Sequence, residues 1–337
     1  MRALITGASG FVGHQLAKLL LRHGTSVIAC MGPSPSPLES WRIRELEKLS
    51  VPMVDLDLRR ERPFDVAPED WDTLFHLASY VKTEAASDDV RVNDEGTRRM
   101  LGQLSLGGKR IVYSSTLAVA DNAPGGNITP DLRCAPRTEY GRTKLAAERI
   151  VARAGDQHRA GWTILRLPTL YGPGYRPGGL FDVLLRLLRR RHPLARLDWP
   201  GRIALMAVDD AAEMIRRTAS TPETLRQLYL ASSNENPAVH ELARAIAEAD
   251  GAPYEAIHVA GPIKALLGLA AGVLQLQGLP HVLQVTAWRT QLLLDGLYCD
   301  GSPLTDLLGL TFRDWREGVR RMYAEDPRAS GTVPAHS

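Results

Sequence analysis

Three glycines spaced by three follow directly on a short apolar segment at the start of the chain. Residues 2–6 have the sequence RALIT, and Gly7, Gly10 and Gly13 come next, ahead of a segment with helical apolar spacing at 11–22. Glycines let the backbone turn tightly and let a pyrophosphate approach the main chain, while free N–H groups at the helix start face the anion. The spacing is one residue wider than the usual dinucleotide fingerprint. We therefore predict a phosphate-binding loop between the first strand and the first helix.

Strand-like and helix-like segments alternate along the first half of the chain. This alternation predicts an α/β fold, in which a parallel sheet has helices on both faces. The predicted strands are 2–6, 25–31, 51–58, 73–78, 110–114 and 162–167, and the predicted helices are 11–22, 38–49, 93–104 and 140–154.

A loop rich in glycine and proline at 172–179 ends this alternation. Beyond it we predict a smaller, mostly helical C-terminal substrate domain over the strand ends, where ligands of such sheets bind. The predicted divisions are a dinucleotide-binding domain at 1–168, a return to its sheet at 203–232 through strands at 203–208 and 228–231, a substrate-binding region at 169–202 and 233–325, and a flexible tail at 326–337.

Charge and cysteine content narrow the possible partners. The chain has 41 basic and 38 acidic residues, a balance that argues against nucleic acid as a partner. The basic run at 186–191 lies on an apolar-periodic stretch, so we expect it to be the solvated face of an amphipathic helix. Cys30, Cys134 and Cys299 are far apart, which predicts no disulfide, no metal site and a reducing, cytoplasmic location. We expect no secretory signal, because glycines interrupt the apolar start.

Residues 265–288 contain no Asp, Glu, Lys or Arg. A membrane span needs about 20 mainly apolar residues, and Gln275, Gln277, Pro280 and His281 break this run into shorter pieces. We therefore predict no membrane span, but buried helices of the second domain that offer an apolar lid over the substrate.

Tyr140 and Lys144 are four residues apart on a predicted helix, so they share one helix face. A tyrosine with its ordinary pKa near 10 is a poor acid or base at neutral pH, and a neighbouring ammonium lowers that pKa by stabilising the phenolate. A hydroxyl donor nearby would polarise a substrate carbonyl. The fifth predicted strand ends in Ser115 and Thr116, which offer such a hydroxyl.

The segment TGASGFVG at 6–13 resembles the TGxxGFxG cofactor loop of the extended short-chain dehydrogenase/reductase family. The resemblance runs to about residue 320 and includes the epimerase/dehydratase and 3β-hydroxysteroid dehydrogenase branches. Further matching pieces, in order, are LDL at 56–58, FHLA at 75–78, Asn93, GT at 96–97, YSST at 113–116, YGRTK at 140–144, Arg166, YGPG at 171–174 and VDD at 208–210.

This resemblance implies a Rossmann-type doubly wound sheet and a hydride transfer between nicotinamide and a carbinol carbon. Tyr140 would exchange the hydroxyl proton, Lys144 would also bind the nicotinamide ribose, and Thr116 would hold the carbonyl oxygen, with Ser115 as the alternative. Asp57 would contact adenine, and Asn93 would support the site structurally or as a relay. The implied cofactor-binding residues are Gly7, Gly10, Phe11, Val12, Gly13, Asp57, Leu58, Leu77, Ala78, Asn93, Tyr140, Lys144, Pro168 and Leu170. A homodimer through the helices of Asn93 and Tyr140 is also implied.

The choice of cofactor depends on the end of the second strand. NAD-specific members place an acid there, whereas this chain has Met31 and Gly32, so we favour NADP over NAD. Arg42 and Arg44, with Ser34 and Ser36 in the preceding loop, either receive a 2′-phosphate or lie solvated on a polar helix.

Three sequence departures bear on the substrate. Leu117 and Ala118 replace the Asp-Glu pair of the dehydratase branch, and Thr169 and Ala204 depart from the sugar-nucleotide pattern, with Arg176 and Arg202 out of register. We therefore predict an oxidoreductase for an apolar small-molecule alcohol or ketone. A nucleotide-sugar 4-epimerase and a non-catalytic dinucleotide sensor are the alternatives.

Overall fold

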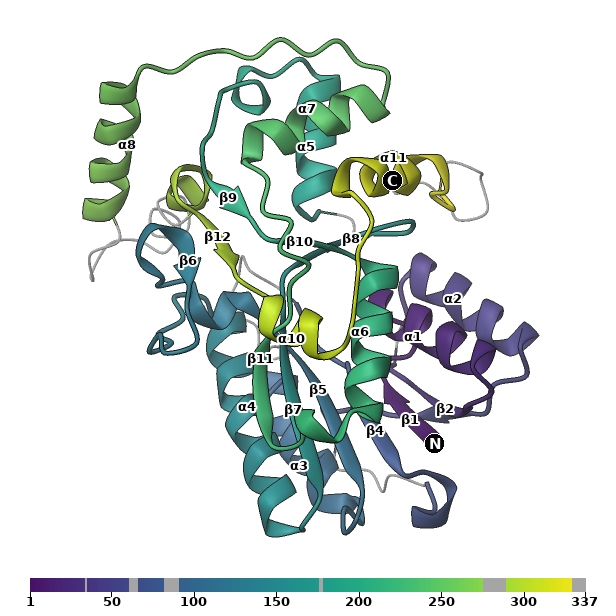
Figure 1. Cartoon of the computed structure of the whole chain (residues 1–337). Coiled ribbons are helices and arrows are strands. Elements are labelled where there is room, and N and C mark those ends of the chain that lie inside the picture. Colours follow the sequence, from purple (N-terminus) through teal and green to yellow (C-terminus); the bar gives the residue numbers. More distant parts are fainter. Residues whose placement is uncertain (34, 61–65, 82–90, 176–177, 275–288, 329–337) are drawn as a thin grey trace.

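The computed structural model describes residues 1–337 except 34, 61–65, 82–90, 176–177, 275–288 and 329–337. Its centre is a seven-stranded parallel sheet with the strand order β11-β7-β5-β4-β1-β2-β3 (Figure 1). The strands are β1 (Arg2–Thr6), β2 (Ser26–Met31), β3 (Met53–Asp55), β4 (Thr73–His76), β5 (Arg110–Thr116), β7 (Gly161–Leu167) and β11 (Gln227–Leu230). The predicted doubly wound α/β fold is confirmed.

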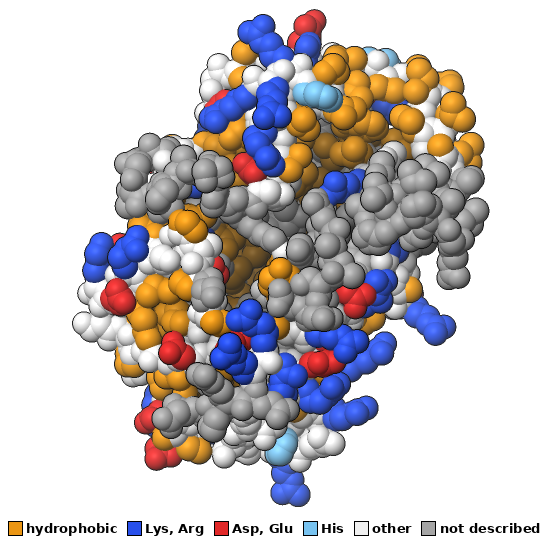
Figure 2. Space-filling model, turned by 180° about the vertical axis from the view of Figure 1, so that it is seen from behind, with side chains coloured by type: hydrophobic (Ala, Val, Ile, Leu, Met, Phe, Trp, Pro, Cys, Tyr) orange, Lys and Arg blue, Asp and Glu red, His pale blue; other side chains and the backbone are white. Residues whose placement is uncertain are grey.

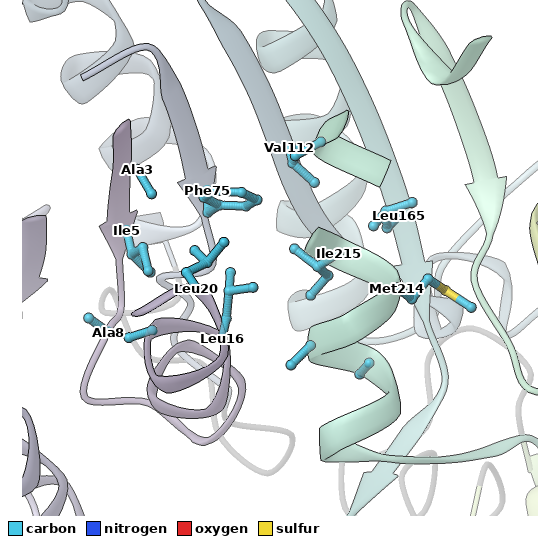
Figure 3. Close-up of a cluster of buried hydrophobic side chains, with 14 of the residues drawn as sticks. Ala3, Ile5, Ala8, Leu16, Leu20, Phe75, Val112, Leu165, Met214 and Ile215 are labelled. Atoms are coloured by element: carbon cyan, nitrogen blue, oxygen red, sulfur yellow. The ribbon is translucent and has the colours of Figure 1, made fainter. Parts of the chain in front are cut away.

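Successive side chains of each strand point to opposite faces of the sheet, so each face carries an apolar core. On β1, Ile5 packs with Leu16 of α1 and Ile215 of α6 (Figure 3), whereas its neighbour Leu4 packs on the opposite side with Met100 of α3. The flanking helices are α1 (Phe11–Arg22), α2 (Pro37–Lys48), α3 (Glu95–Gln103), α4 (Glu139–Gln157) and α6 (Val208–Ser220). Because the strands are covered on both faces, their segments are nearly continuously apolar.

The smaller region lies beyond the carboxyl ends of the strands (Figure 1). Its elements are β6 (Asn127–Ile128), β8 (Thr169–Tyr171), α5 (Leu180–Arg189), β9 (Arg202–Ile203), β10 (Leu205–Ala207), α7 (Val239–Ala249), α8 (Gly261–Leu274), β12 (Gly296–Cys299), α10 (Ser302–Leu307) and α11 (Trp315–Ala324). Helices α5, α7 and α11 share a second core around Phe181, Leu242 and Trp315. Helix α5 buries its leucines and exposes its arginines, as the amphipathic pattern predicts.

The prediction that 203–208 returns to the main sheet is wrong. Strand β10 pairs with β8 in a separate two-stranded sheet, and β9 pairs with β12, which also pairs with β6. Among the described residues beyond 168, only β11 rejoins the main sheet, beside β7. A short apolar strand satisfies either sheet equally well, so its residue types do not distinguish between them.

The uncharged segment at 265–288 also differs from its prediction. Helix α8 covers its first part, and Leu266 and Leu269 there are more than half exposed rather than buried. Figure 2 shows hydrophobic side chains gathered at the end of the molecule that carries the smaller region. Residues 275–288 lie outside the described part. Within the described residues, no helix is both long and apolar enough to cross a membrane.

The C-terminal segment begins with residues that are packed, not flexible. Asp326 and Pro327 are buried, and Arg328 both pairs with Asp326 at 2.5 Å and lies 4.4 Å from the centre of the Tyr175 ring. The predicted flexible tail is therefore wrong for 326–328, and 329–337 lie outside the described residues.

Candidate active site

The glycine loop is shaped by close approaches to two other backbone segments. Gly7 has a φ of +70°, and a Cβ there would lie 2.8 Å from the backbone of Ala78 at the end of β4. A Cβ on Gly13 would lie 2.1 Å from the Gly7 carbonyl oxygen, so only glycine lets α1 start so near β1. Gly10 caps α1 without a side-chain hydrogen bond. The first N–H groups of the helix are thus left for an external anion.

Two adjoining cavities open at the carboxyl ends of the strands, beside this loop. The larger one, of about 540 Å³, is lined by ten of the predicted cofactor residues and by Thr116: Gly7, Gly10, Phe11, Val12, Gly13, Leu77, Tyr140, Lys144, Pro168 and Leu170. The second, of about 380 Å³, adds Asp57, Leu58 and Ala78 and shares Gly7, Gly10 and Leu77 with the first. The structure therefore brings all of the predicted site residues together around one crevice except Asn93.

Tyr140 enters the larger cavity from the first turn of α4. The helix begins at Glu139, and the Thr138 side chain caps it by accepting a hydrogen bond from the Gly141 N–H at 3.1 Å. A Cβ on Gly141 would lie 2.7 Å from the Ala118 carbonyl oxygen, so glycine lets the helix start lie against the segment that follows Thr116. Tyr140 and Thr116 consequently line the same wall.

Lys144 is buried one turn further along α4, with 1% of its surface exposed. Its Nζ donates to the Ser114 carbonyl oxygen at 2.6 Å and lies 4.2 Å from the centre of the Tyr113 ring. Burial lowers the pKa of Lys144 to about 7, against a smaller opposite effect of Glu148. The lysine is therefore poised to change charge near neutral pH.

The two candidate hydroxyls at the end of β5 have different surroundings. Ser115 is 4% exposed, and its Oγ donates to Oε1 of Glu148 at 2.5 Å. Thr116 is half-buried, and its Oγ1 accepts from the Ala118 N–H at 3.2 Å, which leaves the hydroxyl hydrogen available to a ligand in the cavity. The geometry favours Thr116 as the donor.

Asn93 lies behind the cavity wall. Its side-chain oxygen accepts from the Tyr80 N–H at 2.8 Å, and its Nδ2 donates to the Tyr80 carbonyl at 3.0 Å and to Thr143 Oγ1 at 3.2 Å. It therefore joins the segment after β4, which does line the cavity, to helix α4. This arrangement corresponds to the structural role among the two that the resemblance implies.

Asp57 lies at the far end of the crevice, after β3. Its carboxylate accepts hydrogen bonds from Arg59, at 3.0 Å to both the main-chain N–H and Nε, and lies 3.3 Å from Arg60. The hydrogen bond from Arg59 holds the pKa of Asp57 below its usual value, so the group is anionic at neutral pH. An anionic acceptor at this place can bind the amino group of a base.

Arg42 lines the larger cavity, but neither arginine proposed for a 2′-phosphate lines the second cavity, where Asp57 lies. Arg42 is buried, and its guanidinium donates to the carbonyl oxygens of Ser9 at 3.3 Å and Gly174 at 2.5 Å. Arg44 is exposed and does not line either cavity. The structural role of Arg42 was invisible in the sequence because its partners are main-chain atoms. Ser34 and Arg176 lie outside the described residues.

Several cavity residues were not predicted. Glu39 lines the larger cavity from the start of α2, beside Ser36, which the sequence had offered for a 2′-phosphate. Ser36 N donates to Glu39 Oε2 at 2.8 Å in a capping box. The spacing Ser-x-x-Glu is a sequence signal for that box. Ser79, Tyr80 and Leu167 also line the crevice, and they follow β4 or end β7. Residues just past parallel strands are the ones that such a fold places at its ligand.

A family model described as NAD dependent epimerase/dehydratase family matches residues 3–230. The chain belongs to this family. Its members are NAD-dependent enzymes of the extended short-chain dehydrogenase/reductase type, and the resemblance stated from the sequence is confirmed. Within the described residues, no cluster of side chains could hold a metal ion.

Individual relatives differ in activity. The chain is 30% identical to a ceramide reductase of Caulobacter vibrioides over 220 residues, which are 65% of this chain and 61% of that protein. It is 28% identical to a UDP-glucose 4-epimerase of Mycolicibacterium smegmatis over 76% of this chain and 84% of that one. A UDP-glucuronic acid 4-epimerase of Bacillus cereus, solved with NAD, superposes with a TM-score of 0.76 at 20% identity and full coverage of both chains. This last likeness shows the shared fold.

Proposed function

We propose that the chain is an oxidoreductase that transfers a hydride between a nicotinamide cofactor and a secondary alcohol or ketone. The observation that carries this proposal is the convergence of Thr116, Tyr140 and Lys144 in the same cavity as the glycine loop. The loop fits a dinucleotide, because it offers uncapped helix N–H groups and backbone space that no Cβ fills.

The cofactor, when bound, supplies the hydride chemistry, and the chain supplies position and protons. Tyr140 gives a proton to the substrate oxygen during reduction and takes one during oxidation. Lys144 would stabilise the phenolate form of Tyr140 and would help to hold the nicotinamide ribose of a bound cofactor. Thr116 donates a hydrogen bond to the substrate oxygen and so stabilises the charge that develops there.

The proposed substrate is an apolar alcohol or ketone. Leu167, Pro168, Leu170 and Tyr80 give the larger cavity an apolar wall near the catalytic groups. Arg202, a candidate for a sugar nucleotide, donates to the Asn236 carbonyl at 3.1 Å and stacks on Tyr298 at 5.1 Å instead. The ceramide reductase among the relatives is named for a substrate of this apolar kind.

A sugar-nucleotide 4-epimerase is the second candidate, because the mycobacterial epimerase is matched over more of its length. A panel assay separates the two. In one arm, the purified chain is mixed with NADH or NADPH and with long-chain or polycyclic ketones. In the other arm, it is mixed with NAD and with UDP-glucose or UDP-glucuronic acid. Cofactor oxidation by the ketones supports the proposal. C4 inversion of a UDP-sugar without net cofactor turnover overturns the apolar substrate class.

We propose NADP(H) as the preferred form of the cofactor. Cys30 and Gly32 line the crevice at the end of β2, where an acid would reject a 2′-phosphate, and the Glu39 carboxylate nearby is occupied by its capping box. Arg59 lines the same cavity and carries positive charge close to it. Fluorescence titration should give tighter binding of NADPH than of NADH, and the reverse order would reject this preference.

A homodimer through α3 and α4 and a cytoplasmic location also remain proposals. A groove between these helices, lined by Arg98, Ala146, Arg149, Ile150 and Arg153, offers a surface for a second copy. Analytical ultracentrifugation at several protein concentrations measures the oligomeric state directly. A monomer at every concentration would reject the dimer.

A further inference from the structure

A buried carboxylate with no part in the proposed chemistry lies on the same face of α4 as Tyr140 and Lys144. Glu148 is 4% exposed and is one helical turn past Lys144 on α4. Its Oε1 accepts from Ser115 Oγ at 2.5 Å and from Arg166 Nε at 2.9 Å, and its Oε2 accepts from Arg166 Nη2 at 2.8 Å. A buried bidentate ion pair of this kind fixes geometry tightly, since both oxygens are held.

The partners of Glu148 sit next to the site in the sheet. The register of β5 and β7 places Ser115 opposite Arg166, and the next rung places Thr116 opposite Leu167. Both residues of that next rung line the larger cavity. Ser115 lines it too, so Glu148 joins helix α4 to two strands at the edge of the site.

Glu148 interacts with two buried cations. It pairs with Arg166, which is 7% exposed, and it follows Lys144, which is 1% exposed, by four residues on α4, a spacing that lets the two side chains interact. Removal of the carboxylate would leave both cations in a medium of low dielectric constant without it. Glu148 acts to raise the pKa of Lys144, whereas burial lowers it.

Other groups around Lys144 cannot replace the negative charge of Glu148. From β5 come the Ser114 carbonyl and the Tyr113 ring, which are neutral. From β4 comes His76, which burial and Lys144 keep neutral by lowering its pKa to about 3.

Two more groups complete the surroundings of the lysine. Burial raises the pKa of Tyr113, and Tyr140, Glu148 and Asp94 add smaller effects in the same direction. Asp94 lies at the start of α3, and Tyr140 lies one turn before Lys144 on α4. The carboxylate that acts on the Lys144 ammonium among the described residues is that of Glu148.

We propose that Glu148 is a positioning residue, which anchors α4 to β5 and β7 and keeps the buried Lys144 ammonium charged. The inference rests on the proposed function in one respect: the lysine that binds the cofactor ribose must be protonated Lys144. Under that assignment, the affinity for NADH falls as pH rises and Lys144 loses its proton, and the midpoint of this fall reports the charge of Lys144.

NADH fluorescence titration across neutral pH tests the inference without a substrate. For the unmodified chain the affinity should fall with a midpoint near pH 7. Glu148→Gln keeps the shape but not the charge, so the midpoint should move down by about one pH unit. Arg166→Met removes the competing cation, so the midpoint should move up. Glu148→Asp retains the charge and should leave the midpoint near its original place. A purely structural role would not move the two midpoints in opposite directions.

Glu213→Gln is the matched control. Glu213 holds Arg216 at 2.7 Å and Arg217 at 2.6 Å on α6, away from the cavity, so its variant should lose some stability and keep the midpoint. The inference is wrong if folded Glu148→Gln or folded Arg166→Met has the same pH dependence of NADH affinity as the unmodified chain. Thermal unfolding shows whether each variant has folded, and one folded variant is enough for the test. Lys144→Met should abolish the transition. If it does not, the failure lies in the cofactor role of Lys144 and thus in the proposed function.

Discussion

The ammonium nitrogen of Lys144 lies 4.2 Å from the centre of the Tyr113 ring, in a place where neither side chain meets water. The ring face and the Ser114 carbonyl together replace part of the hydration that the ammonium loses. They do not replace all of it, since burial still lowers the lysine pKa to about 7. Burial of the Lys144 ammonium therefore lowers the free energy of unfolding of the chain.

This cost gives a prediction for Lys144→Met. Between the folded pKa of about 7 and the ordinary value of 10.5, the unfolded chain binds a proton that the folded chain does not. Stability of the unmodified chain should therefore rise with pH relative to the variant, by up to about 1.4 kcal/mol per pH unit in this window. Denaturant unfolding of both proteins at several pH values measures the difference. Parallel stability curves would show that Lys144 titrates normally.

Tyr140→Phe should preserve the fold and the cofactor affinity, because it keeps the ring and removes only the transferable proton. Turnover should fall by about 10²-fold or more, the usual scale of general acid–base catalysis. Steady-state rates on the substrate identified in the panel, with cofactor titration as control, test this. A folded variant with the original rate would leave the dinucleotide-sensor alternative as the better account.

Thr116→Ala and Ser115→Ala should separate catalysis from stability. Loss of the Thr116 hydroxyl should lower turnover by about 10²-fold with little change in melting temperature. Loss of the Ser115 hydroxyl removes a hydrogen bond to a buried carboxylate, so it should destabilise the fold by about 1–3 kcal/mol and affect turnover less. The opposite order of rate effects would transfer the catalytic hydroxyl to Ser115.

Arg42→Ala should weaken NADH and NADPH equally, by about 1–3 kcal/mol, because Arg42 supports the glycine loop through the Ser9 carbonyl and not through a 2′-phosphate. Arg44→Ala is the control, and it should alter neither affinity since Arg44 is exposed outside both cavities. Fluorescence titrations give all four constants. If Arg42→Ala weakened only NADPH, Arg42 would instead contact the 2′-phosphate, which is one of the two roles that the sequence allows.

The parts of the site that follow from local sequence were predictable. The glycine spacing determines the turn between β1 and α1, and a separation of four places Tyr140 and Lys144 on one helix face. Both patterns act within a single turn or helix, so no knowledge of the rest of the fold is needed to interpret them.

The parts that depend on register were not predictable. Nothing in the sequence places Ser115 opposite Arg166, because that pairing depends on how far β7 slides along β5. The same limit explains the wrong placement of 203–208, whose apolar residues suit a small second sheet as well as the main one. Helix α8 was wrongly predicted to be buried because an uncharged sequence does not say what covers it.

The two bonds of Arg42 have a consequence for any movement of the segment after β8. One guanidinium holds the glycine loop at Ser9 and the segment after β8 at Gly174, and Pro327 lies beside Gly174. Any hinge motion that swings this segment away from the sheet must break a bond to the loop that receives the dinucleotide. A bound dinucleotide would stiffen that loop and so restrain the hinge.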